Sequence, residues 1–284
     1  MTAEAVWGFG FGSHGSEAPG KACEMKVAIV GKDGVGKTTF SAALTRALAD
    51  AGRSVFAIDA DPNNCLAYAL GVPPEVAARI RPLSDMTDLL AERAGASAGQ
   101  GGMFVLNPEV KDIIEEHTIV HDGIRLLVMG TIERGGSGCV CPESNTLKAL
   151  VRELVDLPDD LVLDMEAGLE HLGRGTARAV DALIAVTTPE ATSLRTVLRI
   201  RSLAGDLGLN RLVAVANRVQ SPEDRARVGE ALGDIPVVAE LGLYPGLSSD
   251  CTLTCEPGKQ LAEDVRAQVG AIERQVTGDG NHGP

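Results

Sequence analysis

The chain has 284 residues, of which 44% are hydrophobic and 23% charged, the composition of a folded globular protein with one large domain or two small ones. Acidic side chains outnumber basic ones by 39 to 26, and the resulting net charge of -13 disfavours nucleic acid and an anionic membrane surface as partners. No apolar run approaches the ~18 residues that a membrane-spanning helix needs.

Residues 1–24 are rich in Gly, Ser and Ala without a hydrophobic period, so we expect a disordered leader. The leader lacks the pattern of a secretory signal, which predicts a cytoplasmic protein whose six cysteines are thiols or metal ligands rather than disulfides. We expect a single domain over residues 25–276 and a frayed tail over 277–284. Mixed polarity, a Pro-Pro pair and a Gly-rich patch predict an insertion in this domain at about residues 72–123.

Short apolar runs alternate with segments of helical length along this domain. Because the runs are continuously apolar, they are typical of strands that are covered on both faces of a sheet. We therefore predict an α/β fold with a doubly wound, mostly parallel central sheet and helices on both faces. The predicted strands are Val27 to Gly31, Ser54 to Ile58, Ile124 to Met129, Leu161 to Met165, Ala182 to Thr187, Leu212 to Ala216 and Val237 to Ala239.

The first predicted strand runs into a phosphate-binding loop of the form G-x-x-x-x-G-K-[ST], directly before a helical pattern. Its glycines let backbone N–H groups and the helix amino end point at phosphate oxygens, while a lysine adds positive charge and a threonine hydroxyl is a ligand for Mg2+. This strand, loop and helix predict that the chain binds a nucleoside triphosphate. The predicted nucleotide ligands in the loop are Gly34, Val35, Gly36, Lys37, Thr38 and Thr39.

Carboxylates follow two other predicted strands. Asp59 and Asp61 end the second strand, and Asp164 ends the fourth. Beside a phosphate loop, carboxylates at the carboxyl ends of parallel strands can hold the hydration shell of Mg2+ or orient an attacking water. Asn217 follows a later strand and offers a donor and an acceptor together, as an adenine edge requires, although a turn or helix cap would use the same side chain.

Two cysteines, Cys139 and Cys141, form a C-x-C motif between the third and fourth of these strands. On extended backbone the side chains of residues i and i+2 project to one side, close enough to share a metal ion. Two small buried side chains would give the same pattern, so the motif alone favours a metal only modestly.

Lys32 precedes Lys37 by five positions in the same loop, and together with the carboxylates this arrangement resembles the MinD/ParA-like class of P-loop ATPases. The resemblance implies that Lys32 reaches across a nucleotide-bridged homodimer to the partner's phosphates. It also implies that Asp61 orients the attacking water, that Asp59 and Asp164 are outer-sphere partners of Mg2+, that Gly168 donates to the γ-phosphate, and that Asn217 contacts adenine.

Within this class, two segments resemble the CooC family, the ATPases that mature nickel carbon monoxide dehydrogenase. They are Met-Gly-Thr-Ile-Glu-Arg-Gly-Gly-Ser-Gly-Cys-Val-Cys-Pro-Glu, from Met129 to Glu143, and the segment from Asp164 to Thr176. The resemblance spans about residues 25–240. It implies an ATP-driven dimer that holds Ni2+ or Zn2+ between paired C-x-C motifs and delivers nickel to the apo form of carbon monoxide dehydrogenase or a similar client.

Two features depart from the family pattern: Asp33, and the segment after Ala239, which departs from the family's usual Pro-Tyr-Asp segment and weakens the case for base recognition. Asp33 adds negative charge at a loop position that is usually Gly, which is expected to weaken nucleotide binding or slow hydrolysis. Cys251 and Cys255 have no counterpart in the resemblance, and their i, i+4 spacing fits packing on one helix face, a redox pair or two further metal ligands.

Two other functions compete with the metallochaperone. An iron-sulfur electron-transfer ATPase like the nitrogenase iron protein would place a cluster on four cysteines. A MinD/ParA-type positioning ATPase would bind membrane or DNA, but the segment from Glu256 onward lacks the basic amphipathic face that membrane attachment requires.

Overall fold

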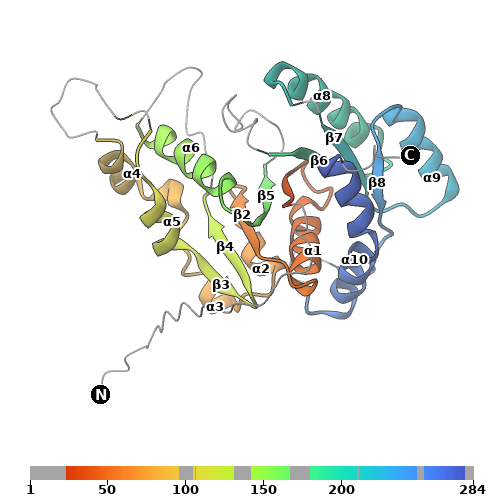
Figure 1. Cartoon of the computed structure of the whole chain (residues 1–284). Coiled ribbons are helices and arrows are strands. Elements are labelled where there is room, and N and C mark those ends of the chain that lie inside the picture. The colour runs from red at the N-terminus through yellow and green to blue at the C-terminus, as the bar shows by residue number, and fades with distance from the viewer. Residues whose placement is uncertain are drawn as a thin grey trace, which may run out of the picture.

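The computed structural model describes residues 24–95, 105, 107–130, 142–166, 180–209, 211–247 and 253–278. These residues form an eight-stranded sheet of order β3-β4-β2-β5-β1-β6-β7-β8 (Figure 1). All neighbours are parallel except β3 and β4, which are antiparallel. The strands are β1 (Lys26–Val30), β2 (Val55–Ala60), β3 (Ile119–His121), β4 (Ile124–Val128), β5 (Asp160–Met165), β6 (Ala182–Thr187), β7 (Leu212–Ala216) and β8 (Val237–Glu240).

Helices cover both faces of the sheet, which confirms the predicted doubly wound α/β fold. The described helices are α1 (Lys37–Asp50), α2 (Leu66–Ala69), α3 (Pro74–Ala77), the 3-10 helix η1 (Leu83–Asp85), α4 (Thr87–Arg93), α5 (Lys111–His117), α6 (Pro142–Val155), α8 (Ala191–Leu207), α9 (Pro222–Leu232) and α10 (Glu256–Thr277). Helices α1, α2 and α10 pack on one face, and α4, α5, α6, α8 and α9 pack on the other.

Alternate residues of the central strands pack into two separate hydrophobic cores, one on each face of the sheet. Val27 and Ile29 of β1 pack with α1 and α10, whereas Ala28 and Val30 pack with the opposite helical layer. Every residue of β5 and of β6 is buried. Side chains that alternate between two buried faces explain why these strands are continuously apolar in sequence.

Strand β3 lies in the segment 72–123 and was not among the predicted strands. It has only three residues, pairs with β4 along one edge of the sheet and leaves Val120 68% exposed. An edge strand this short has no buried face to impose a hydrophobic pattern on its sequence. The helices described in this segment are α3, η1, α4 and α5, all of them short.

The carboxyl ends of the parallel strands all lie on the same side of the sheet, across the strand direction, and the candidate site lies at these strand ends. The β1–α1 loop starts there, Asp59 pairs in register with Asp164 of the adjacent strand, and Asn217 follows β7. Among the residues that the structure describes, no helix has the length and apolar character to cross a membrane.

Candidate nucleotide-binding site

The loop between β1 and α1 is held tightly against its neighbours by two glycines. A Cβ on Gly31 would lie 2.3 Å from the Val186 carbonyl oxygen, and a Cβ on Gly36 would lie 2.7 Å from Nδ2 of Asn217. Gly36 also has a φ of 97° and caps α1, whose first turn contains no acidic residue. The loop therefore turns sharply into the amino end of a helix, where unpaired N–H groups favour an anion.

The two lysines of this loop have different surroundings. Lys37 is buried, with 6% of its side chain exposed, and its Nζ lies 3.3 Å from Oδ1 of Asp33, whose side chain is 81% exposed. The Nζ of Lys32 instead donates to Oγ1 of Thr192, in the first turn of α8, at 3.1 Å. Lys37 thus contributes its charge inside the loop, while Lys32 lies against a different element.

Asp59 and Asp164 are both fully buried at the ends of β2 and β5. Asp59 accepts hydrogen bonds from the backbone N–H groups of Leu66 at 2.9 Å and Asp61 at 3.2 Å. Burial and the neighbouring Asp164 nevertheless raise the pKa of Asp59 to about 8. The pKa of Asp164 is raised to about 6, mainly by burial, although hydrogen bonds from Thr38 and Ser41 oppose the shift.

These acids fit a hydrated Mg2+. The Oδ2 atom of Asp164 is buried and has no hydrogen-bond partner among the described residues. An orphaned carboxylate oxygen inside a group of mutually repelling acids is stabilised by a cation or by a water bound to one. The hydroxyl of Thr38 bonds to the same carboxylate, so the predicted magnesium residues Thr38, Asp59 and Asp164 lie together.

Asp61 follows β2 with its carboxylate fixed by a local turn. Its Oδ1 accepts from the backbone N–H and from Nδ2 of Asn63, both at 2.8 Å. Only 8% of Asp61 is exposed, and its charge contributes to the raised pKa of Asp164. The side chain lines the same cavity as the loop residues Lys37 and Thr38.

Asn217 ties the phosphate loop to the end of β7. Its Nδ2 donates to the Val35 carbonyl at 2.7 Å, and its Oδ1 accepts from the backbone N–H of Arg218 at 2.9 Å. A primary amide has two donor hydrogens and two acceptor lone pairs. One of each remains, which is the pair of groups that an adenine edge needs.

A cavity of about 470 Å³ opens beside these residues. Its lining residues include several that were not predicted, among them Cys65, Arg218 and Tyr244. Burial, followed by the charges of the three nearby aspartates, raises the pKa of the Cys65 thiol. The Tyr244 hydroxyl donates to Asp264 at 2.6 Å, which fixes the segment after β8 to α10. Of these three residues, Arg218 could have been predicted from the sequence, because it directly follows the predicted site residue Asn217.

Several predicted residues lie outside the described part of the chain: Cys139, Cys141, Gly168 and Cys251. Cys255 is disulfide-bonded, so the expectation that no cysteine forms a disulfide is wrong for this residue. It is also the N-cap of α10, which begins at Glu256, so Cys255 does not lie on a helix face. In the described ranges, no three His, Cys, Asp or Glu side chains cluster in a way that suits a metal ion.

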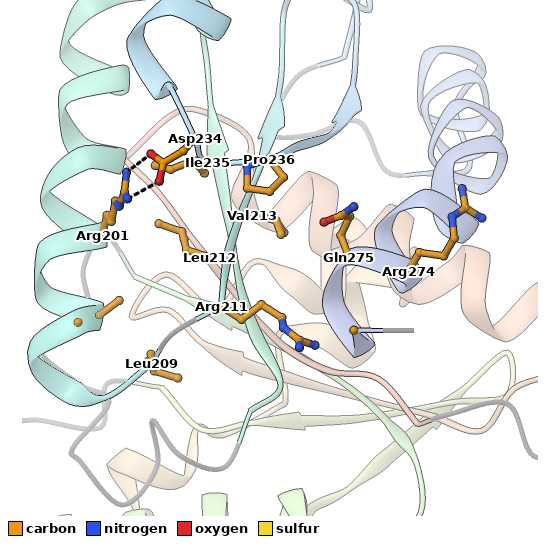
Figure 2. Close-up of a pocket in the computed structure, with 13 residues that line it drawn as sticks. Arg201, Leu209, Arg211, Leu212, Val213, Asp234, Ile235, Pro236, Arg274 and Gln275 are labelled. Carbon is orange, nitrogen blue, oxygen red and sulfur yellow. Dashed lines mark hydrogen bonds and ion pairs between the residues drawn. The ribbon is translucent and has the colours of Figure 1, made fainter. Parts of the chain in front are cut away.

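A second cavity, of about 600 Å³, lies at the opposite edge of the sheet, beside the start of β7 (Figure 2). Arg201 forms a two-fold hydrogen-bonded ion pair with Asp234, at 2.5 and 2.6 Å. Arg211 donates to the Val276 carbonyl at the end of α10. Because helix carboxyl ends are partially negative, Arg211 stabilises the end of α10, and we assign this cavity no chemistry.

Comparison with known proteins places this geometry in a family. The model of the CobQ/CobB/MinD/ParA nucleotide binding domain matches residues 26–242. The carbon monoxide dehydrogenase accessory protein CooC of Rhodospirillum rubrum is 48% identical over 219 residues, which cover 75% of this chain and 83% of that protein. An uncharacterized ATP-binding protein of Methanocaldococcus jannaschii is 46% identical over 77% of this chain and 82% of its own.

Solved structures agree on the fold. The MinC:MinD cell division protein complex of Aquifex aeolicus aligns with a TM-score of 0.62, covering 92% of this chain and 98% of that one. MinD of Pyrococcus furiosus aligns with a TM-score of 0.56, covering 88% and 98%. The sequence identities are 19% and 24%, so these two structures support the fold alone.

Proposed function

Because the chain belongs to the CobQ/CobB/MinD/ParA family, and within it to the CooC-type ATPases, we propose that it is a cytoplasmic metallochaperone that uses ATP to insert nickel into carbon monoxide dehydrogenase or a related nickel enzyme. The observation that carries the proposal is the 48% identity to CooC over 75% of the chain. That the chain is an ATPase follows from the family itself.

The nucleotide site would work mainly by positioning and charge neutralisation. Lys37 and the N–H groups at the start of α1 bind the phosphates, and Gly168 adds a backbone donor to the γ-phosphate. Asp61, fixed at Oδ1 by Asn63, keeps its other oxygen for orienting the attacking water.

Thr38, Asp59 and Asp164 would hold Mg2+, with the two carboxylates acting through its bound waters. When bound, the ion supplies positive charge that stabilises the phosphoryl oxygens during transfer. Asn217 positions adenine with its remaining donor and acceptor, while its two existing bonds keep the phosphate loop in place.

We propose that ATP also drives dimerisation, with Lys32 leaving Thr192 to contact the partner's phosphates. Light scattering with a non-hydrolysable ATP analogue tests this step. Lys32→Ala should lose analogue-dependent dimers while binding the nucleotide as a monomer, whereas the exposed Lys259→Ala on α10 should behave as wild type. A Lys32→Ala variant that dimerises normally would remove this step.

The cargo site rests on Cys139 and Cys141. A tetrahedral thiolate site needs four ligands, and one C-x-C motif supplies two, so the metal would be shared between two chains. Size-exclusion chromatography with elemental analysis should give one Ni2+ or Zn2+ per dimer. Cys139→Ala with Cys141→Ala should abolish metal binding, and Cys251→Ala with Cys255→Ala should retain it. The reverse result would favour a site within one chain.

A further inference from the structure

Helix α1 carries two buried hydroxyl groups, Ser41 and Thr45, that are four residues apart and therefore lie on the same side of the helix. Both residues are 0% exposed. The Ser41 hydroxyl donates to Oδ1 of Asp164 at 2.9 Å. The Oγ1 of Thr45 has no partner in the described part of the chain. Only one of these otherwise similar groups is connected to the nucleotide site.

The Ser41 bond departs from what helix geometry alone favours. A buried serine within a helix ordinarily bonds back to the carbonyl of residue i−4, one turn earlier. Ser41 instead reaches a carboxylate 123 positions away in the sequence, on β5. The hydroxyl hydrogen of Ser41 is therefore used in the bond to Asp164 rather than in a bond within the helix.

Asp164 has two oxygens in different situations. Oδ1 accepts from the Ser41 hydroxyl at 2.9 Å, while the buried Oδ2 has no partner among the described residues. Donors on one side of a carboxylate fix its rotation and leave the lone pairs of the other oxygen in a defined direction. The other described hydroxyl that acts on this carboxylate is that of Thr38, which lowers the pKa of Asp164 and is itself a proposed magnesium ligand.

We propose that Ser41 is a positioning residue for magnesium, whose hydroxyl orients Asp164 so that Oδ2 remains available to a water of the magnesium–nucleotide complex. This inference rests on the proposed ATPase site and adds to it a residue outside the phosphate-loop motif. A purely structural role, in which Ser41 only fastens α1 to β5, would affect stability without affecting the dependence of nucleotide binding on magnesium.

The test is a titration of Mg2+ against protein saturated with a fluorescent ATP analogue, alongside analogue binding in EDTA. Ser41→Ala should raise the Mg2+ concentration at half-saturation about 3- to 10-fold, the range expected when one hydrogen bond of ordinary net strength is lost. Metal-free analogue binding should stay unchanged. Ser41→Cys, with a similar volume and a weaker donor, should give an intermediate shift.

Thr45→Val is the matched control, because it removes a buried hydroxyl from the same helix without touching Asp164. It should leave both measurements at the wild-type value. An unchanged Mg2+ requirement in Ser41→Ala, an equal shift in Thr45→Val, or an equal loss of metal-free binding would each overturn the role of Ser41. If the wild type itself showed no Mg2+-dependent nucleotide binding, the proposed ATPase site would fail as well.

Discussion

The ion pair between Asp33 and Lys37 gives a quantitative prediction about nucleotide affinity. The Asp33 carboxylate lies 3.3 Å from the lysine that is proposed to bind the phosphates, so ATP has to displace it. Asp33 would also repel the phosphates directly. We therefore expect Asp33→Asn to bind ATP more tightly than the wild type.

The size of the gain follows from exposure. Because the Asp33 side chain is 81% exposed, water screens the pair, and such pairs contribute about 0.2–1 kcal/mol. Tenfold in affinity corresponds to about 1.4 kcal/mol, so losing the pair should tighten binding about 1.5- to 5-fold at low salt. At about 1 M salt, where the Debye length is about 3 Å, the gain should nearly vanish.

Fluorescent ATP-analogue titrations at about 0.01 M and about 1 M salt measure both quantities. Asp33→Glu keeps the charge and should bind close to the wild type, and Asp88→Asn, an exposed acid on α4, should have no effect. Equal or weaker binding by Asp33→Asn, or a gain that persists at high salt, would refute the electrostatic reasoning.

Three further predictions concern stability and base recognition. The pKa of Asp59 rises from 3.8 to about 8 on folding, so the folded state holds this proton more tightly than the unfolded state does. The metal-free protein should therefore lose stability as pH rises from about 4 to 8. Urea unfolding measured in EDTA should show a smaller loss of stability over this pH range for Asp59→Asn than for the wild type. Asn217→Ala should weaken ATP binding about 10-fold and reduce the preference for ATP over GTP in competition titrations, because it removes the adenine contact and the bond to Val35. Arg211→Ala should lower Tm by about 2–4 °C without changing ATPase activity, because it uncovers the Val276 carbonyl at the end of α10.

Each of these three predictions has a contrary outcome. A pH profile of Asp59→Asn parallel to that of the wild type would assign the pH dependence to other groups. Unchanged ATP selectivity in Asn217→Ala would leave that residue with a structural role in the loop. An unchanged Tm in Arg211→Ala would mean that the end of α10 needs no cationic partner.

The sequence predicted the central sheet and the grouping of its acids well, for a physical reason. Strands buried on both faces must be continuously apolar, and the carboxyl ends of parallel strands share one edge. The sequence alone therefore places Asp59 and Asp164 together, and in the structure they lie in register on adjacent strands. Strand β3 was not predicted, because a three-residue edge strand does not require a continuously apolar sequence.

Other features depend on contacts between residues that are far apart in the sequence, and such contacts leave no pattern in the neighbouring residues. Ser41 acquires its partner from a residue 123 positions away, and nothing in the sequence around Ser41 identifies that partner. The interpretation that Cys255 packs on a helix face could have been avoided. Pro257, in the first turn of α10, is typical of a helix start and places Cys255 before the helix. Its disulfide depends on the proximity of another cysteine, which spacing alone does not fix.

Transfer of nickel to an apoenzyme tests the central claim most directly. Nickel-free carbon monoxide dehydrogenase would be incubated with limiting Ni2+, Mg·ATP and this protein, and its carbon monoxide oxidation activity measured over time. We predict activation that requires ATP and is lost with Lys37→Ala and with Cys139→Ala plus Cys141→Ala, while Thr45→Val supports it fully. Equal activation by the double cysteine variant, or by the wild type without ATP, would contradict an ATP-driven nickel insertion through the C-x-C motif.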